Sequence, residues 1–297
     1  MRTVLTDLVR VGRFTPAAPY QRLGYACAAV LLASGLFHLG VYAVDGGSWQ
    51  GPVSWRKPVV FGLSFAITLA TVTWFMTFLR PRRFVGWLVV GVYSLASLGE
   101  VFLISMQRWR GVPSHFNDST PFNESVFSMM GALVSVIAVL TVTIAVWSWL
   151  RMDAPPSLAL AIRLGLLLML VSQGVGVQMI VEGGNTFGAA GALKWPHAVT
   201  LHAAQVLPAL ALALLASPAR ELLRVRVVEL GAAGYVVLIG STMVQTYAGR
   251  APLDIDVATG ALAYIGLGLL VTSAAIALHG LAESAGLVGH SAHPRTP

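Results

Sequence analysis

Ionisable and amide side chains recur inside or at the ends of long apolar segments, where such groups are rare. Residues three, four or seven apart share a face of an α-helix, so Ser34, His38 and Tyr42 form one polar stripe. Further face-sharing pairs are Lys57 with Ser64, Glu100 with Gln107, Gln178 with Glu182, His202 with Gln205, and Ser241 with Gln245. Because a charge or an imidazole in hydrocarbon is costly, these residues predict an asymmetric polar pocket in one half of a membrane.

Two histidines in this set could hold a cofactor. Neutral imidazole suits iron, copper and zinc, so His38 and His202 are candidate ligands of a heme b iron or another metal. Gln205 and Gln107 are candidate contacts of a heme or a quinone. The alternative is that each histidine only forms a hydrogen bond to a neighbouring helix.

Glu100 and His115 are the candidate catalytic residues. Glu100 lies about two turns inside its segment, so we expect it to pair with Lys57, His38 or an arginine, or to stay protonated because desolvation disfavours the charged form. It is predicted to be a proton-relay acid or, alternatively, part of an ion pair that only joins helices.

The tract from Gln107 to Asn117 is dense in side chains that bind ligands. Arg108 and Arg110 match the geometry of a carboxylate or phosphate, and Asn117 could assist them. The alternative is that both arginines reach lipid headgroups while Trp109 lies in the aromatic belt. Other candidate substrate-binding residues are Lys57, Glu182, His197 and Gln245.

Composition places these residues in a membrane protein. Apolar residues make up 56% of the 297, charged residues only 10%, and the mean hydropathy is +0.76. A helix needs about 20 apolar residues to cross a bilayer. Eight such segments are predicted, at about 22–44, 57–79, 84–107, 126–149, 159–182, 197–217, 227–249 and 257–281. Below the membrane midplane these helices are expected to be nearly featureless, and Pro208 is expected to kink the sixth.

The basic residues report orientation. With the N-terminus inside, one side of the membrane holds 13 of the 19 Lys and Arg residues and the other holds 6. The positive-inside bias therefore favours cytoplasmic N- and C-termini in a bacterial inner membrane. This placement explains the net charge of +7 without a nucleic-acid partner. The lipid bilayer and a small-molecule ligand are the expected partners.

An internal duplication is predicted from matches at an offset near 137 residues. Val44-Asp45-Gly46-Gly47 matches Val181-Glu182-Gly183-Gly184, and Gln107 matches Gln245. Four spans per half give the halves the same orientation, so the fold class is all-α, with two parallel four-helix repeats over 1–150 and 151–297 and a short disordered C-terminal tail.

Two resemblances follow from these residues. The run Gln107–Asn117, with Thr120-Pro121-Phe122-Asn123 after it and Trp55-Arg56-Lys57-Pro58 before it, resembles a family of bacterial eight-helix membrane proteins, which implies no particular activity. The layout of eight spans in two parallel halves also resembles heme A synthase. That family has a histidine pair in each half, whereas here His38, His197 and His202 have no counterparts in the other half, so the likeness is architectural.

Three functions fit this sequence. The first is a redox protein that binds heme, quinone or a metal in the polar pocket. The second is a secondary transporter or channel for a small, anionic solute, which needs a polar path across the membrane. The third is a lipid-modifying enzyme of the outer face, with Ser114 beside His115 as a candidate nucleophile.

Overall fold

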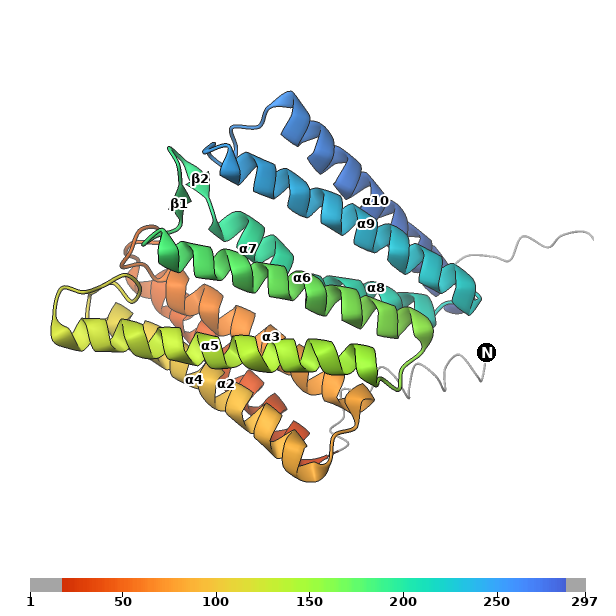
Figure 1. Ribbon diagram of the computed structural model, residues 1–297, viewed down its shortest axis with the longest axis horizontal. Helices are drawn as coiled ribbons and strands as arrows, with labels where there is room; N and C mark the ends of the chain where they lie inside the picture. Colours follow the sequence, from red (N-terminus) through yellow and green to blue (C-terminus); the bar gives the residue numbers. More distant parts are fainter. Residues whose placement is uncertain (1–17, 287–297) are drawn as a thin grey trace, which may run out of the picture. The chain divides into compact units, whose positions relative to one another are not determined.

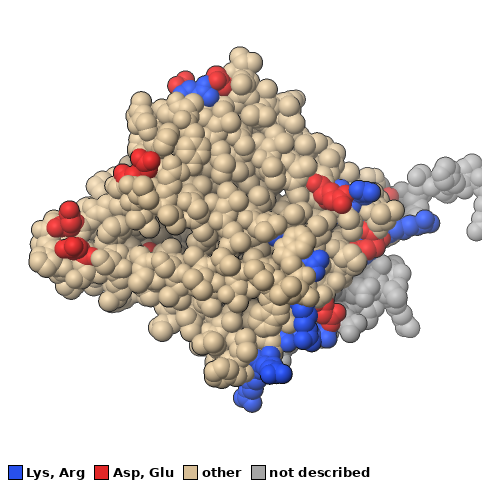
Figure 2. Space-filling view, viewed as in Figure 1, with Lys and Arg blue, Asp and Glu red and all other residues tan. Residues whose placement is uncertain are grey.

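The computed structural model describes residues 18–286, which are helical apart from one short β-hairpin. Eight helical segments of this range are long and apolar enough to cross a membrane, which confirms the eight predicted spans. The protein is a multi-pass integral membrane protein. In Figure 2 the charged side chains lie near the helix ends, with a broad uncharged surface between them. The predicted tail at 287–297 lies outside the described residues.

The described chain divides into two compact units, one up to Asp153 and one from Ala154 onward. The first unit contains α2 (Pro19–Asp45), α3 (Arg56–Leu79), α4 (Arg83–Trp109) and α5 (Pro121–Leu150) (Figure 1). Helices α2, α3 and α4 pack against one another, and α5 packs against α4. The end of this unit that carries the connections 46–55 and 110–120 is called its loop end below.

The second unit contains α6 (Pro156–Val181), β1 (Thr186–Phe187), β2 (Gly191–Ala192), α7 (Lys194–Leu201), α8 (Ala203–Leu215), α9 (Glu221–Tyr247) and α10 (Val257–Ser284). Strands β1 and β2 form an antiparallel hairpin between α6 and α7. The sixth span is thus two helices, α7 and α8, which meet at His202, whereas Pro208 lies inside α8. Pro208 cannot donate to the carbonyl of Ala204, and the interruption at His202 lies two residues before Ala204.

Glycines allow two close helix crossings. A Cβ built on Gly62 of α3 would lie 2.8 Å from the Cα of Gly35 on α2. In the second unit, a Cβ on Gly234 of α9 would lie 2.8 Å from the carbonyl oxygen of Gly266 on α10. Small residues at such crossings let the backbones touch, which is a common mode of helix association in membranes.

Polar side chains are also buried away from the loop end of the first unit. Gln21 donates a hydrogen bond to the carbonyl of Thr73 at 3.2 Å and to the hydroxyl of Thr77 at 2.9 Å. Ser94 and Ser148 are buried as well. This differs from the predicted featureless inner halves, because isolated serines and threonines barely change the average hydropathy of a segment and so escape a reading based on apolar length.

Candidate functional site

The buried carboxyl group of Glu100 lies beside His115 at the loop end of the first unit. Glu100 is 1% exposed, and its Oε1 lies 4.0 Å from Nε2 of His115. The other ring nitrogen, Nδ1, lies 2.9 Å from the Ser114 hydroxyl, which lies 3.5 Å from Nζ of Lys57. The structure therefore brings together Lys57, Glu100 and His115 from α3, α4 and the following loop. The nearest basic group to Glu100 is His115 rather than the expected partners.

The protonation of this chain follows from its donors and acceptors. Burial, together with the positive charge of Lys57, lowers the pKa of His115 to about 3, so its imidazole is neutral at pH 7. The Lys57 ammonium group can only donate, so the Ser114 oxygen accepts from it and its hydroxyl proton is free to point at Nδ1 of His115. This arrangement leaves the imidazole proton on Nε2, facing Glu100.

Aromatic rings surround the His115 imidazole. The ring centroids of Phe61, Phe116 and Phe127 lie 5.4, 6.1 and 6.4 Å from it. Phe116 has a φ of +55°, a conformation that L-residues rarely adopt. These rings exclude water from one side of His115, which explains why the charged imidazolium is disfavoured.

His38 lies in a second arrangement of the same loop end. Its Nδ1 lies 2.7 Å from the carbonyl oxygen of Ser34, and its Nε2 accepts a hydrogen bond from the Trp109 indole at 3.1 Å. The Trp109 ring meets the Trp55 ring edge-on, and the Arg108 guanidinium stacks over Trp55 at 3.8 Å. Both nitrogens of His38 are therefore used, and the residue positions Trp109, Trp55 and, through them, Arg108.

Three cationic side chains of the loop end have no acidic partner. Within residues 18–286, Arg56, Lys57 and Arg108 form no ion pair, although each is half-buried. The Nε atoms of Arg56 and Arg108 are buried without a hydrogen bond. Elsewhere the described arginines with ion pairs are Arg80 with Asp153, Arg224 with Glu221, Arg226 with Glu229, and Arg250 with Asp256. Among the described residues of the first unit, the half-buried cations without an ion pair thus all lie at the loop end.

The remaining predicted residues of this loop hold the loop itself. Gln107 donates to Oδ1 of Asn123 at 3.1 Å. Arg110 donates to Oε1 of Gln107 and to Oδ1 of Asn123. Asn117 donates to the Pro113 carbonyl at 2.7 Å and accepts from Ser119. Gln107 and Arg110 therefore join the end of α4 to Asn123 at the start of α5, and Asn117 holds the loop between the two helices.

Gln245 is third from the end of α9, as Gln107 is third from the end of α4. Its Nε2 donates to the carbonyls of Ala251 and Asp254, and its Oε1 accepts from the Thr259 hydroxyl at 3.0 Å. Asp256 caps α10 through the Thr259 amide and pairs with Arg250, and these contacts hold the pKa of Asp256 below its usual range. Gln245 is therefore part of a closed network in which the charges are paired.

The other predicted residues of the second unit lie apart from this network. His197 on α7 has Nδ1 within 2.9 Å of the Ser172 carbonyl oxygen, and His202 ends the same helix. The side-chain amide of Gln205 is buried without a hydrogen-bond partner in the described chain. Glu182 is exposed at the end of α6. His38 and His202 belong to different units.

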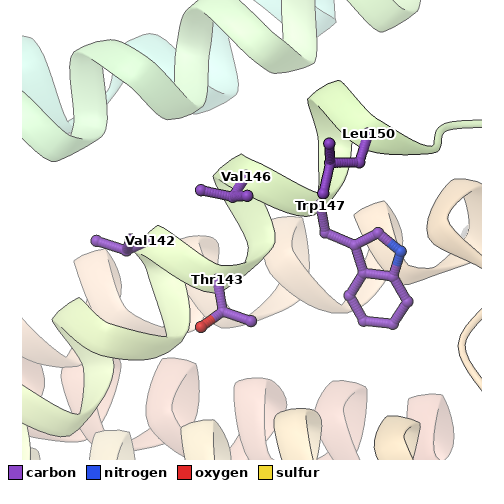
Figure 3. Close-up of a pocket in the computed structure, with 5 residues that line it drawn as sticks. All are labelled: Val142, Thr143, Val146, Trp147 and Leu150. Atoms are coloured by element: carbon purple, nitrogen blue, oxygen red, sulfur yellow. The ribbon is translucent and has the colours of Figure 1, made fainter.

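No group of three or more His, Cys, Asp and Glu residues within 18–286 is arranged to hold a metal ion. The depression drawn in Figure 3 lies on α5 and is lined by Val142, Thr143, Val146, Trp147 and Leu150. Its apolar walls offer no group for acid–base chemistry or ligation. The candidate acid–base groups of the first unit, Glu100 and His115, lie instead at its loop end.

Two functional contributions were not recognised from the sequence. Trp55 entered the sequence analysis only through a family resemblance, and Trp109 only through the alternative of an aromatic belt, yet these rings join His38 to Arg108. The adjacency of Trp55 to Arg56 and Lys57 was the available signal. No protein-family model, curated protein or solved structure matches the chain.

Proposed function

We propose that this membrane protein is a secondary transporter whose first unit binds a small anionic solute at its loop end. The observation that carries the proposal is the group of three half-buried cations, Arg56, Lys57 and Arg108, without an acidic partner among the described residues. Partly desolvated positive charge is costly unless an anion compensates it. A carboxylate or phosphate supplies that compensation and accepts charge-assisted hydrogen bonds.

Two of the three cations, Arg108 and Lys57, have contacts that fix their places. Arg108 stacks on Trp55, which contacts Trp109, and Trp109 donates to His38. Lys57 is tied to Ser114 and so to the neutral His115. A cation held by neutral neighbours keeps its charge available for a ligand, whereas the charge of Arg250 is neutralised by an ion pair with Asp256.

The experiment is binding of inorganic phosphate and of acetate to the detergent-purified protein, measured by calorimetry at low ionic strength. We expect saturable binding of at least one anion, weakened about ten-fold or more in Lys57→Met and in Arg108→Met, because a charge-assisted hydrogen bond contributes about 1.5–3 kcal/mol. Lys57→Arg should keep most of the affinity. Uptake of the bound anion into proteoliposomes then tests transport.

Arg80→Met is the matched control, since Arg80 is an exposed arginine paired with Asp153. It should bind the anion as the wild type does. Absence of binding for both anions, or an equal loss in Arg80→Met, would overturn the proposal. Elution on size exclusion and the melting temperature establish that each variant is folded.

A quinone-binding redox protein is the second candidate. It is favoured by the three phenylalanine rings around His115 and by the Glu100 oxygen that has no hydrogen-bond partner, since a quinone needs an aromatic setting and proton donors. Heme or metal ligation by His38 would have to displace Trp109 or Ser34. A Soret band in the purified protein that disappears in His38→Ala would favour heme, and saturable binding of a short-chain quinone that is lost in His115→Phe would favour quinone.

We further infer two parallel four-helix repeats, and cytoplasmic termini in a bacterial inner membrane. The inference is supported by the positive charges on one side in the sequence and by the equivalent Gln107 and Gln245 networks. The resemblance to a bacterial eight-helix family remains part of this proposal. Cysteine labelling from outside the cell tests the orientation: Ser48→Cys should react and Arg82→Cys should not.

A further inference from the structure

Polar side chains form a continuous stripe on the buried face of α4. Gln107, Glu100, Ser97 and Tyr93 follow one another at spacings of seven, three and four residues, and each is at most 1% exposed. Residues with these spacings lie on one side of a helix. A stripe of this kind is costly inside a membrane protein unless its groups have partners.

The stripe continues toward the opposite end of the unit on neighbouring helices. The Tyr93 hydroxyl lies next to Thr141 on α5. One turn farther, the Thr73 hydroxyl of α3 lies where α2 and α4 meet it, since a Cβ built on Gly24 would lie 2.3 Å from this oxygen and 2.8 Å from Val90. Gln21 then connects Thr73 with Thr77. Buried polar groups therefore occur at every level from His115 to the turn between α3 and α4.

Several groups of this column lack a protein partner. In the described chain the hydroxyls of Tyr93 and Thr73 and Oε2 of Glu100 are buried without a hydrogen bond. Buried polar atoms are nearly always hydrogen-bonded to protein or to ordered water. One helical turn is about 5.4 Å, which one water spans with two hydrogen bonds of about 2.8 Å. Waters at these places would join the groups into one chain.

We propose that this column is a proton pathway through the first unit, with Glu100 as its proton-carrying group. Because 4.0 Å separates Nε2 of His115 from Oε1 of Glu100, a water joins them: the Nε2–H bond breaks as its proton passes to this water, the water gives a proton to the Glu100 carboxylate, and Nδ1 takes the Ser114 proton. Ser114 regains a proton from the Lys57 ammonium group, and water at the loop end reprotonates Lys57. The net step moves one proton from water to Glu100, with no change in oxidation state. Glu100 then passes its proton to water and hydroxyl groups along Ser97, Tyr93 and Thr73.

The test is proton flux into proteoliposomes that carry a pH-sensitive dye, driven by a potassium gradient with valinomycin. The wild-type protein should conduct protons well above empty liposomes. Glu100→Gln, which keeps the shape and removes the exchangeable charge, should lower the flux at least ten-fold. Tyr93→Phe and Thr141→Val should lower it several-fold, because each interrupts the column.

Thr143→Val is the matched control for Thr141→Val. Both residues are threonines of α5 that donate to their own helix, but Thr143 is exposed and Thr141 is buried beside Tyr93. Thr143→Val should conduct as the wild type does. Flux equal to that of empty liposomes, or flux unchanged in Glu100→Gln, would overturn the pathway.

The pathway and the anion site fail separately. Glu100→Gln and Tyr93→Phe leave Arg56, Lys57 and Arg108 in place, so phosphate or acetate binding should stay within two-fold of the wild type. Loss of flux with intact anion binding supports the pathway. Anion binding without any proton flux in the wild type refutes the pathway and leaves the anion site standing.

Discussion

At the end of α4, Gln107 bonds to Asn123 in the first turn of α5, and at the end of α9, Gln245 bonds to Thr259 in the first turn of α10. Thr120 caps α5 and Asp256 caps α10 in the same way. Around Gln245 the single arginine is paired with Asp256, whereas the cations beside the Gln107 network have no acidic partner in the described chain. The two helix pairs thus share these hydrogen-bonding contacts and differ in whether the nearby positive charge has an acidic partner.

The largest effect is expected where the two helix pairs agree. Gln107→Leu removes one hydrogen bond from Asn123 and one from Arg110, which stay bonded to each other, and Gln245→Leu removes the bonds to Thr259 and to two carbonyls. Each substitution should lower the free energy of unfolding by about 2–3 kcal/mol, because two or more buried hydrogen bonds are lost in each. Thermal unfolding in detergent measures both. A loss in only one of the two variants would break the equivalence of the helix pairs.

His38 and its contacts belong to the first unit alone, so a substitution of His38 tests what distinguishes this unit from the second. His38→Phe removes the partner of the Trp109 indole and leaves the Ser34 carbonyl without its side-chain donor, which should cost about 1–2 kcal/mol and weaken anion binding several-fold through Arg108. Tryptophan fluorescence should shift as Trp109 loses its partner. His279→Phe, at an exposed histidine of α10, should change neither quantity. Unchanged fluorescence in His38→Phe would contradict the positioning role.

Lowering the pH should destabilise the loop end of the first unit before it affects the Gln245 network of the second unit. The pKa of folded His115 is about 3, whereas an unfolded histidine binds a proton near 6.5, so the stability that its neutral form provides is complete above that value and falls as the pH drops. Between pH 6.5 and 5.5 the loss should be about 1 kcal/mol. Melting temperatures of wild type and His115→Phe at these two values test this. A slope that persists in His115→Phe assigns the effect to another group.

The smallest effect on stability is expected at the ion pair between Arg250 and Asp256 in the second unit. Asp256→Asn keeps a side chain that can cap α10 and removes only an exposed charge. The pKa of Asp256 is depressed, so its charge contributes above the ordinary aspartate range and is lost only as the pH falls through its folded value. At pH 7 the melting temperature should change by less than about 2 °C. A larger loss than in Gln245→Leu would reverse the ranking.

Apolar length was enough to predict the eight spans, because membrane helices must satisfy their own backbones over a fixed thickness. The interruption at His202 was not predicted in place, since proline distorts the turn before it and the sequence does not specify which residue absorbs the change. Glu100 was expected to pair with Lys57, His38 or an arginine, or to stay protonated. Its neighbour, His115, lies in a loop and shares no helical spacing with it.

Most features of the candidate site that were not predicted from the sequence depend on contacts between residues far apart in the chain. His38 and Trp109 are 71 residues apart, and neither the helical period nor the polar stripe Ser34–His38–Tyr42 relates them. Arg110 and Asn117 looked like ligand-binding groups because of their chemistry. In the structure their donors are used by Gln107, Asn123 and Pro113, and residue type alone cannot reveal such internal pairing.

The crossing of Gly35 and Gly62 sets the distance between α2 and α3, on which the proposed anion site depends. Gly62 lies five residues after Lys57 on α3, and Gly35 lies three residues before His38 on α2. A methyl group at either glycine would push the two axes apart and carry the ammonium group away from the tryptophan–arginine stack. Substitutions at Gly35 or Gly62, which do not line the proposed site, would therefore change the distance between α2 and α3 and with it the size of the solute that fits.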